Sequence, residues 1–194
     1  MWESKMITYI YMVRHGESPK AQGTERTRGL TEKGKEDSER ISKMLQKEEI
    51  DLFVSSPYQR AILTINDLAA ALGKEVFIME DLKEKVFSLD TVPLTNNELY
   101  PFLSKSFSNP DYALAGAESN RVCQKRAIKV LKQLLTTYAG KKIAIGTHGV
   151  VMTLMMSYYD RRFDLEFLLH TTKPDIYRMK FMKNELVEVE RLWE

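Results

Sequence analysis

The sequence predicts an α/β protein: a single-domain three-layer sandwich with a mostly parallel central sheet, helices on both faces and an antiparallel hairpin at its C-terminal edge. Short apolar runs alternate with segments of helical periodicity, which is typical of strand–helix–strand units. Several of these runs lack polar alternation, as expected of strands that are buried on both faces. A length of 194 residues suits one core, and we find no internal repeat or linker, so residues 1–194 are expected to form one domain.

The first half of the chain alternates predicted strands and helices. Residues 7–13 are β-branched and aromatic, and we expect them to form a buried strand. A helix is predicted over residues 31–47, followed by a strand over 51–55. The next helix is expected to begin at the Ser56-Pro57 pair, because a serine cap and a first-turn proline mark helix starts. Gly73 is expected to end it.

In the second half of the chain, an irregular segment interrupts the alternation of strands and helices, which then continues. Residues 81–117 contain three prolines, and we interpret them as an insertion over the sheet with one short helix over 98–103. The remaining predicted elements are a third strand over 75–79, a long helix over 118–138, a fourth strand over 142–146, a helix over 148–158 and hairpin strands over 176–182 and 186–192.

Composition excludes several functional classes. A formal net charge of +2 is too small to indicate a nucleic-acid-binding surface. No segment approaches the length of about 20 apolar residues that a membrane span needs. The apolar run over residues 7–13 is too short for a secretory signal, so we expect a cytoplasmic protein with no membrane partner. The single cysteine, Cys123, allows no intramolecular disulfide, and we expect it to be structural.

The ends of the predicted strands carry the chemistry. In parallel sheets, ligands bind beyond the carboxyl ends of the strands. His15 and His148 each follow a buried strand directly, and each is followed by glycine. Arg14 adjoins the first histidine, and Arg60 lies one turn into the helix after the second strand. If the strands are parallel, both imidazoles and both arginines meet at one edge of the sheet.

This set of residue types suits phosphoryl transfer. The charge of a transferring phosphoryl group lies on its oxygens, and the planar fork of arginine matches them. A neutral imidazole can attack phosphorus, and nearby arginines disfavour its protonation. Glycines after the histidines would let the backbone approach an anion, and helix starts after the second and fourth strands would offer N–H groups.

Four blocks together resemble the histidine phosphatase superfamily, which includes the cofactor-dependent phosphoglycerate mutases. They occur in the family order and cover most of the chain. The blocks are Arg-His-Gly-Glu at 14–17, Leu-Thr-Glu-Lys-Gly at 30–34, Ser-Ser-Pro-Tyr-Gln-Arg-Ala at 55–61 and Thr-His-Gly at 147–149.

The resemblance implies a role for each matching residue. His15 matches the nucleophile that becomes phosphohistidine, while Arg14, Arg60 and His148 match the residues that stabilise the phosphoryl group. Glu84 matches the family's proton donor, with three other carboxylates as alternatives: Glu80, Asp81 and Glu118. No cofactor or metal ion is expected. The expected substrate contacts are Arg14, Gly16, Ser18, Arg60, His148 and Gly149.

The sequence departs from the family pattern between its first two blocks. Mutases, and many of the family's phosphatases, carry an asparagine soon after Arg-His-Gly and a longer loop before Leu-Thr, and residues 18–29 have neither. A mutase must retain its intermediate and exclude water, so this departure favours hydrolysis of a small phosphate ester. Two alternatives stay open: a phosphoglycerate-type phosphomutase, and a weakly catalytic phosphate-binding interaction module.

Three features are left open by the sequence. The loop cations either extend the anion site or face solvent; they are Lys20, Arg26 and Arg28. The rings of the insertion either line a leaving-group pocket or anchor the insertion; they are Phe87, Tyr100, Phe102, Phe107 and Tyr112. His170 has no metal-ligand partner nearby, and we expect it to be structural or exposed.

Overall fold

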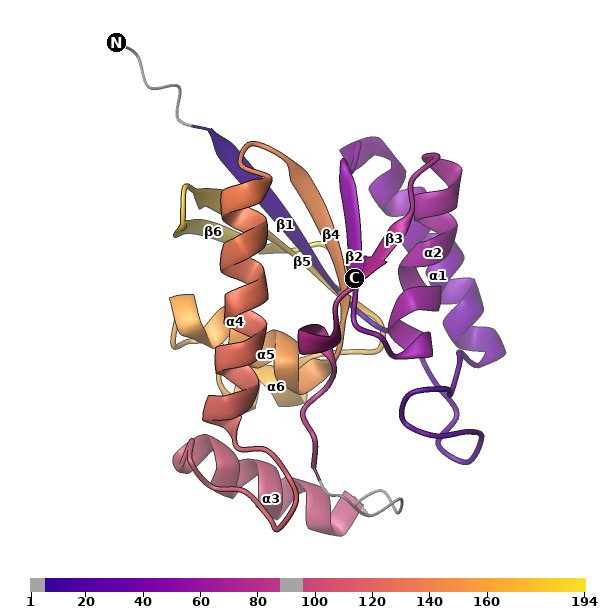
Figure 1. Ribbon diagram of the computed structural model, residues 1–194. Helices are drawn as coiled ribbons and strands as arrows, with labels where there is room; N and C mark the ends of the chain where they lie inside the picture. Colours follow the sequence, from indigo (N-terminus) through magenta and orange to yellow (C-terminus); the bar gives the residue numbers. More distant parts are fainter. Residues whose placement is uncertain (1–5, 88–95) are drawn as a thin grey trace.

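One six-stranded sheet organises the protein, in the order β3-β2-β4-β1-β5-β6 (Figure 1). The computed structural model describes residues 6–87 and 96–194. The first four strands along the chain are parallel, whereas the last two form an antiparallel hairpin at the edge beside β1. The strands are Ile7–Arg14 (β1), Leu52–Ser55 (β2), Val76–Ile78 (β3), Lys142–Thr147 (β4), Asp175–Met182 (β5) and Glu185–Arg191 (β6).

Helices cover both faces of this sheet, as predicted. α1 and α2 pack together on one face, and α4 and α5 pack on the other (Figure 1). The α-helices are Glu32–Leu45 (α1), Gln59–Ala71 (α2), Asn96–Ser108 (α3), Asn120–Thr137 (α4), Gly149–Tyr159 (α5) and Leu165–His170 (α6), and two short 3₁₀ turns span Gln46–Glu48 and Glu80–Leu82. None of the helices in the described residues is long and apolar enough to cross a membrane.

Successive side chains of β1 point to opposite faces of the sheet, and this explains the three layers. Ile10 and Met12 belong to the core under α4 and α5, whereas Tyr11 and Val13 belong to the core under α1 and α2. All four side chains are at most 1% exposed. Burial of each such side chain stabilises the fold by roughly 1.5–3 kcal/mol relative to exposure, so β1 needs a helix layer on both sides.

The predicted start of α1 is confirmed, whereas the predicted start of α2 is wrong. The hydroxyl of Thr31 caps α1 by accepting a hydrogen bond from Gly34 N, 3.1 Å away. Ser56 does not cap α2, which begins three residues later at Gln59. The Ser56 hydroxyl is instead 2.7 Å from the Nε2 atom of His148. The expected capping serine therefore belongs to the site at the sheet edge.

The helix in the insertion is longer than the sequence predicts. α3 continues through Pro101 to Ser108, although proline removes one backbone donor. Phe102 and Leu103 are each only 6% exposed, and their burial outweighs that loss. α6 was not predicted, although the Asp164 side chain caps it by accepting a hydrogen bond from Phe167 N.

Aromatic contacts hold the insertion together. The ring of Phe102 lies 5.8 Å from that of Phe87 and 5.9 Å from that of Tyr112. Phe87 and Phe107 also pack against the larger hydrophobic core, whereas Tyr100 is 54% exposed. These contacts favour the anchoring interpretation of the rings over a leaving-group pocket. α3 and the loop that follows β1 both lie beyond the carboxyl ends of the parallel strands (Figure 1).

Candidate active site

The two predicted histidines meet at the carboxyl ends of β1 and β4. These neighbouring parallel strands pair Arg14 with Thr147, so the next residue of each strand reaches the same edge. The ring centroids of His15 and His148 are 5.2 Å apart. The residues are 5% and 0% exposed, respectively. The juxtaposition expected from parallel strands is therefore present.

Hydrogen bonds define the protonation state of His15. Its Nδ1 atom is 2.7 Å from the carbonyl oxygen of Gly16, which can only accept, so Nδ1 carries the proton. The Nε2 atom accepts a hydrogen bond from Nε of Arg60 at 3.2 Å. Burial and then the charge of Arg60 hold the pKa of His15 well below 6.5, with smaller contributions from Arg14 and Lys173. The ring is therefore neutral, with an unshared electron pair on Nε2.

Arg14 is held by the segment that joins α6 to β5. Its Nη1 atom donates to the carbonyl and hydroxyl oxygens of Thr171, which follows α6. Burial lowers the pKa of Arg14, while the nearby carboxylates of Glu84 and Asp175 counteract that effect. Asp175 is fully buried and receives both Nε and Nη2 of Arg191 at 2.9 Å. The guanidinium of Arg14 is thus held by hydrogen bonds to Thr171 and by the charge of Asp175 at the start of β5.

His148 lies deeper than His15. Its Nε2 atom faces the Ser56 hydroxyl, and its ring packs edge-on against Tyr58 with centroids 5.1 Å apart. Burial, followed by the charge of Arg60, holds the pKa of His148 well below 6.5. Among the described residues, its Nδ1 atom and Nε of Arg14 are buried polar atoms without a protein partner. Such atoms are rare in folded proteins and are commonly satisfied by a ligand or water.

Glu84 reaches this edge from the segment after β3. Its carboxylate accepts hydrogen bonds from Val150 N at 3.1 Å and Val151 N at 2.9 Å, in the first turn of α5. It also accepts one from Lys85 N at 2.8 Å. The free N–H groups that we expected at the start of this helix are therefore occupied by a carboxylate. Glu84 consequently lies just beyond His148.

The three alternative carboxylates are engaged elsewhere or face solvent. Glu80 is half-exposed and pairs with Arg26 at 2.7 Å. Asp81 is exposed. Glu118 binds Arg126 and accepts a hydrogen bond from Val86 N; burial raises its pKa, but these partners outweigh that effect and lower it. Of the four carboxylates, Glu84 is the one whose charge counteracts the lowering of the pKa by burial at both Arg14 and Arg60.

The predicted small contact residues have structural partners. The N–H of Gly16 donates to the Thr64 hydroxyl at 3.0 Å, so it does not face an anion as expected. A Cβ atom on Gly16 would lie 3.0 Å from the carbonyl oxygen of Gly34, which explains the glycine by backbone packing. Ser18 donates to the Gly29 carbonyl and accepts from Arg28 at 2.8 Å. A Cβ atom on Gly149 would lie 2.9 Å from Nη2 of Arg14.

Three charged residues at the site were missed or left open by the sequence. Arg28, whose side chain is 14% exposed, turns inward, whereas Arg26 stays on the rim. Glu25 binds both Arg28 and Arg60. Partial loss of hydration and the neighbouring cations, Arg14 first, lower the pKa of Lys173 to about 8. Lys173 begins the segment that leads into β5, whose antiparallel direction brings it to this edge.

The other two singled-out residues lie away from the site. Cys123 is fully buried, and burial holds the pKa of its thiol well above the ordinary value. His170 is exposed at the end of α6, with Nδ1 2.7 Å from the carbonyl oxygen of Glu166. In the residues that the structure describes, no group of three or more His, Cys, Asp or Glu side chains is arranged to hold a metal ion.

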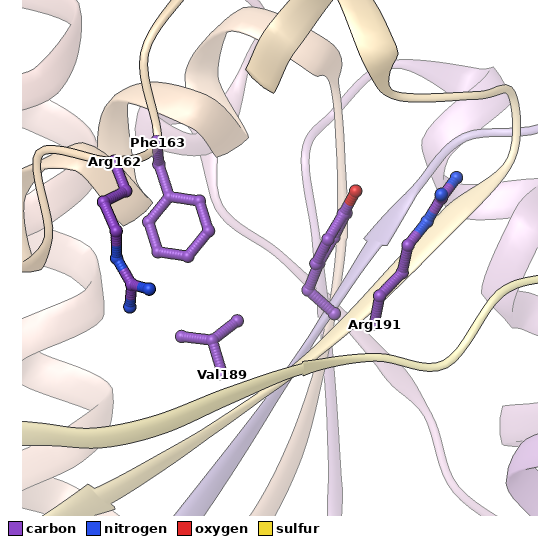
Figure 2. A pocket seen from close by; sticks show the side chains of 5 residues that line it. Arg162, Phe163, Val189 and Arg191 are labelled. Carbon is purple, nitrogen blue, oxygen red and sulfur yellow. The ribbon is translucent and has the colours of Figure 1, made fainter. Parts of the chain in front are cut away.

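A hollow of about 260 Å³ lies outside the histidine site (Figure 2). It is lined by Arg162, Phe163, Tyr177, Val189 and Arg191. Both arginines have carboxylate partners, because Arg162 pairs with Asp160 and Arg191 pairs with Asp175. This hollow therefore gives less support for a reactive site than the sheet edge does.

Comparisons agree with this fold. The phosphoglycerate mutase from Bacillus anthracis aligns with a TM-score of 0.81 and 16% sequence identity, over 96% of this chain and 93% of that one. A phosphoserine phosphatase from Entamoeba histolytica, in complex with 3-phosphoglyceric acid, aligns with a TM-score of 0.77 and 23% identity, over 95% and 96%. A mycobacterial glucosyl-3-phosphoglycerate phosphatase aligns with a TM-score of 0.76 and 16% identity, over 95% and 97%.

The sequence comparisons give the family. A search of the curated proteins returns no match. The family model described as histidine phosphatase superfamily (branch 1) matches residues 10–190, which include both histidines, both arginines and Glu84. This chain therefore belongs to the histidine phosphatase superfamily.

Proposed function

We propose that this protein hydrolyses small phosphate monoesters through a phosphohistidine formed on His15. The observation that carries the proposal is the neutral ring of His15, whose Nδ1 proton is held by the Gly16 carbonyl while Nε2 keeps its electron pair. This nitrogen is set among Arg14, Arg60 and a second buried imidazole. Such a nucleophile surrounded by cations suits attack on an anionic phosphoryl group.

In the first step the hydrogen bond from Nε of Arg60 to Nε2 of His15 breaks, and Nε2 forms a bond to phosphorus as the ester P–O bond breaks. The leaving oxygen takes a proton from the protonated form of Glu84, whose side chain is hydrogen-bonded to the first turn of the helix that follows His148. Arg14, Arg60 and His148 stabilise the charge on the phosphoryl oxygens during transfer. The product alcohol then departs, and the enzyme retains the phosphoryl group.

The second step returns the enzyme to its resting state. Water attacks phosphorus while Glu84, now ionised, takes the proton from it. The P–N bond breaks, inorganic phosphate is released and His15 becomes neutral again. The shortened segment over residues 18–29 supports hydrolysis over a mutase cycle, because the latter must keep water from the intermediate.

A substrate panel tests the proposal on wild type, His15→Ala and His170→Ala. His170 provides the matched control because it is an exposed histidine whose ring is hydrogen-bonded to the carbonyl of Glu166 in α6. We expect wild type and His170→Ala to release inorganic phosphate and to show an acid-labile, alkali-stable phosphoenzyme, and His15→Ala to show neither. Formation of an isomer that requires a bisphosphorylated primer would indicate the mutase. Phosphate binding without turnover on any ester would indicate the interaction module.

A further inference from the structure

Each of the three nitrogens of Arg60 donates one hydrogen bond beside the proposed nucleophile. Nε donates to Nε2 of His15 at 3.2 Å. Nη1 donates to the backbone carbonyl of Glu25 at 2.5 Å, and Nη2 donates to the Glu25 carboxylate at 2.9 Å. Arg60 is only 1% exposed, so its guanidinium has little freedom to take further partners. A phosphoryl group that takes the Nη2 hydrogen bond of Arg60 must therefore displace the Glu25 carboxylate.

Glu25 is itself a charged group in this setting. Burial acts to raise its pKa, but the charges of Arg60 and Arg28 outweigh that effect and lower it. Arg28 binds the carboxylate through Nε and Nη2, both at 3.2 Å. One carboxylate thus occupies two arginines beside the proposed nucleophile.

Hydrogen bonds within the loop over residues 24–28 fix the backbone on both sides of Glu25. Arg28 N donates to the carbonyl of Thr24 at 3.0 Å, which closes a tight turn around Glu25. Thr24 N donates to the Thr27 hydroxyl at 2.9 Å, and Gln59 N at the start of α2 donates to the carbonyl of Arg26 at 2.9 Å. The Glu25 side chain is nevertheless 55% exposed, so it can rotate into solvent without dismantling the turn.

We infer that Glu25 is an internal anion in the proposed phosphoryl site: its carboxylate competes with substrate and product phosphate for Arg60 and Arg28, and so sets their affinity. The inference rests on the proposed function. When a phosphate dianion replaces the singly charged carboxylate, the negative charge beside the two arginines increases by one. When a phosphate monoanion replaces it, that charge stays the same. The competition therefore favours phosphate monoester dianions and speeds release of the product by returning Glu25 to Arg60.

Calorimetric titration with inorganic phosphate tests the inference without requiring turnover. Glu25→Gln removes the charge but retains the shape of the side chain, and Glu25→Ala removes both. We expect the Kd for phosphate to fall about fivefold in each, the upper range for a partly exposed ion pair. Glu17→Gln is the matched control, because Glu17 is an exposed carboxylate near the site whose described partner is Thr31. It should shift the Kd less than twofold.

The outcomes separate this inference from the proposed function. An unchanged or weakened affinity in Glu25→Gln would mean that Glu25 only positions Arg60, and would overturn the inference; a lower kcat at unchanged KM would accompany it. Absence of phosphate binding in wild type and both variants overturns it as well. Tighter phosphate binding in the variants without hydrolysis of any ester leaves the inference standing and rejects only the proposed function.

Discussion

Glu84 is hydrogen-bonded to the backbone N–H of Val151, with Oε1 2.9 Å from that nitrogen. This contact joins the segment after β3 to the first turn of the helix that follows His148. In the proposed reaction this carboxyl group gives its proton to the oxygen of the departing alcohol. The position of Glu84 is thus set by α5, and its contribution can be tested separately from that of the imidazoles.

Replacing Glu84 with glutamine should affect substrates according to their leaving groups. General acid catalysis contributes about a hundredfold or more, so we expect kcat to fall by that factor for alkyl phosphates. Nitrophenyl phosphate should be much less affected, because nitrophenolate departs without a proton. Steady-state kinetics on both substrate types measure the difference, with the exposed Asp81→Asn as control. Equal losses on both types would contradict the role of proton donor.

The pH dependence of the reaction should reflect the lowered pKa of His15. Burial and Arg60 keep the ring neutral to well below pH 6.5, so the nucleophile is available there. We expect kcat/KM to show no loss attributable to His15 between pH 7 and 6, and to decline only at lower pH. The profile should be checked by NMR titration of the ring. A midpoint for His15 at or above 6.5 would oppose this assignment.

The two buried imidazoles should make folding stability depend on pH. Both rings have a pKa below 6.5 in the folded state, so the unfolded chain binds more protons as the pH falls below 6.5. The two rings therefore leave the free energy of unfolding unchanged above pH 6.5. Below that pH they lower it by up to about 1.4 kcal/mol per pH unit for each ring. Urea unfolding from pH 7 to 5 measures the slope, which should be smaller in His15→Ala. A slope unchanged by that substitution would argue against burial of a neutral ring.

Gly149→Ala should impair the site more than the fold. Its Cβ atom would lie 2.9 Å from Nη2 of Arg14, and the guanidinium must move to make room. We expect at least about a tenfold loss of kcat/KM from this displacement. Gly73→Ala is the matched control: Gly73 has a φ of +63° and nothing within 4 Å, so alanine should cost about 1 kcal/mol of stability without reducing activity. Equal activity losses in the two variants would contradict the role given to Gly149.

Strand direction made the core of the site predictable from the sequence. Because β1 and β4 are parallel neighbours, residues that follow them share an edge, and this brought His15 and His148 together as expected. A local helix-start pattern was less reliable: the Ser56-Pro57 pair predicted a capping serine, and Ser56 does not cap α2. Tertiary contact with His148 overrides that local preference.

The remaining charged groups depend on geometry that no local pattern encodes. Glu25 reaches Arg60 through a loop closed by turn hydrogen bonds, and loop paths are not fixed by periodicity. Lys173 precedes a strand, whereas the carboxyl-end rule for parallel sheets points only to residues that follow strands. Since β5 is antiparallel to β1, its start lies at the edge where β1 ends, with Asp175 opposite Arg14. The predicted antiparallel hairpin therefore already implied that residues just before its first strand lie at this edge.

The attachment of Arg14 to Thr171 has a consequence for biosynthesis. A residue made among the first fifteen receives its partner from the last quarter of the chain, and β1 finds both of its neighbours in strands made more than a hundred residues later. A growing chain that has not yet made the segment from β4 to β5 therefore holds His15 without His148 and without the partner of Arg14. In the proposed reaction, we expect activity only after that segment has been made and has paired with β1.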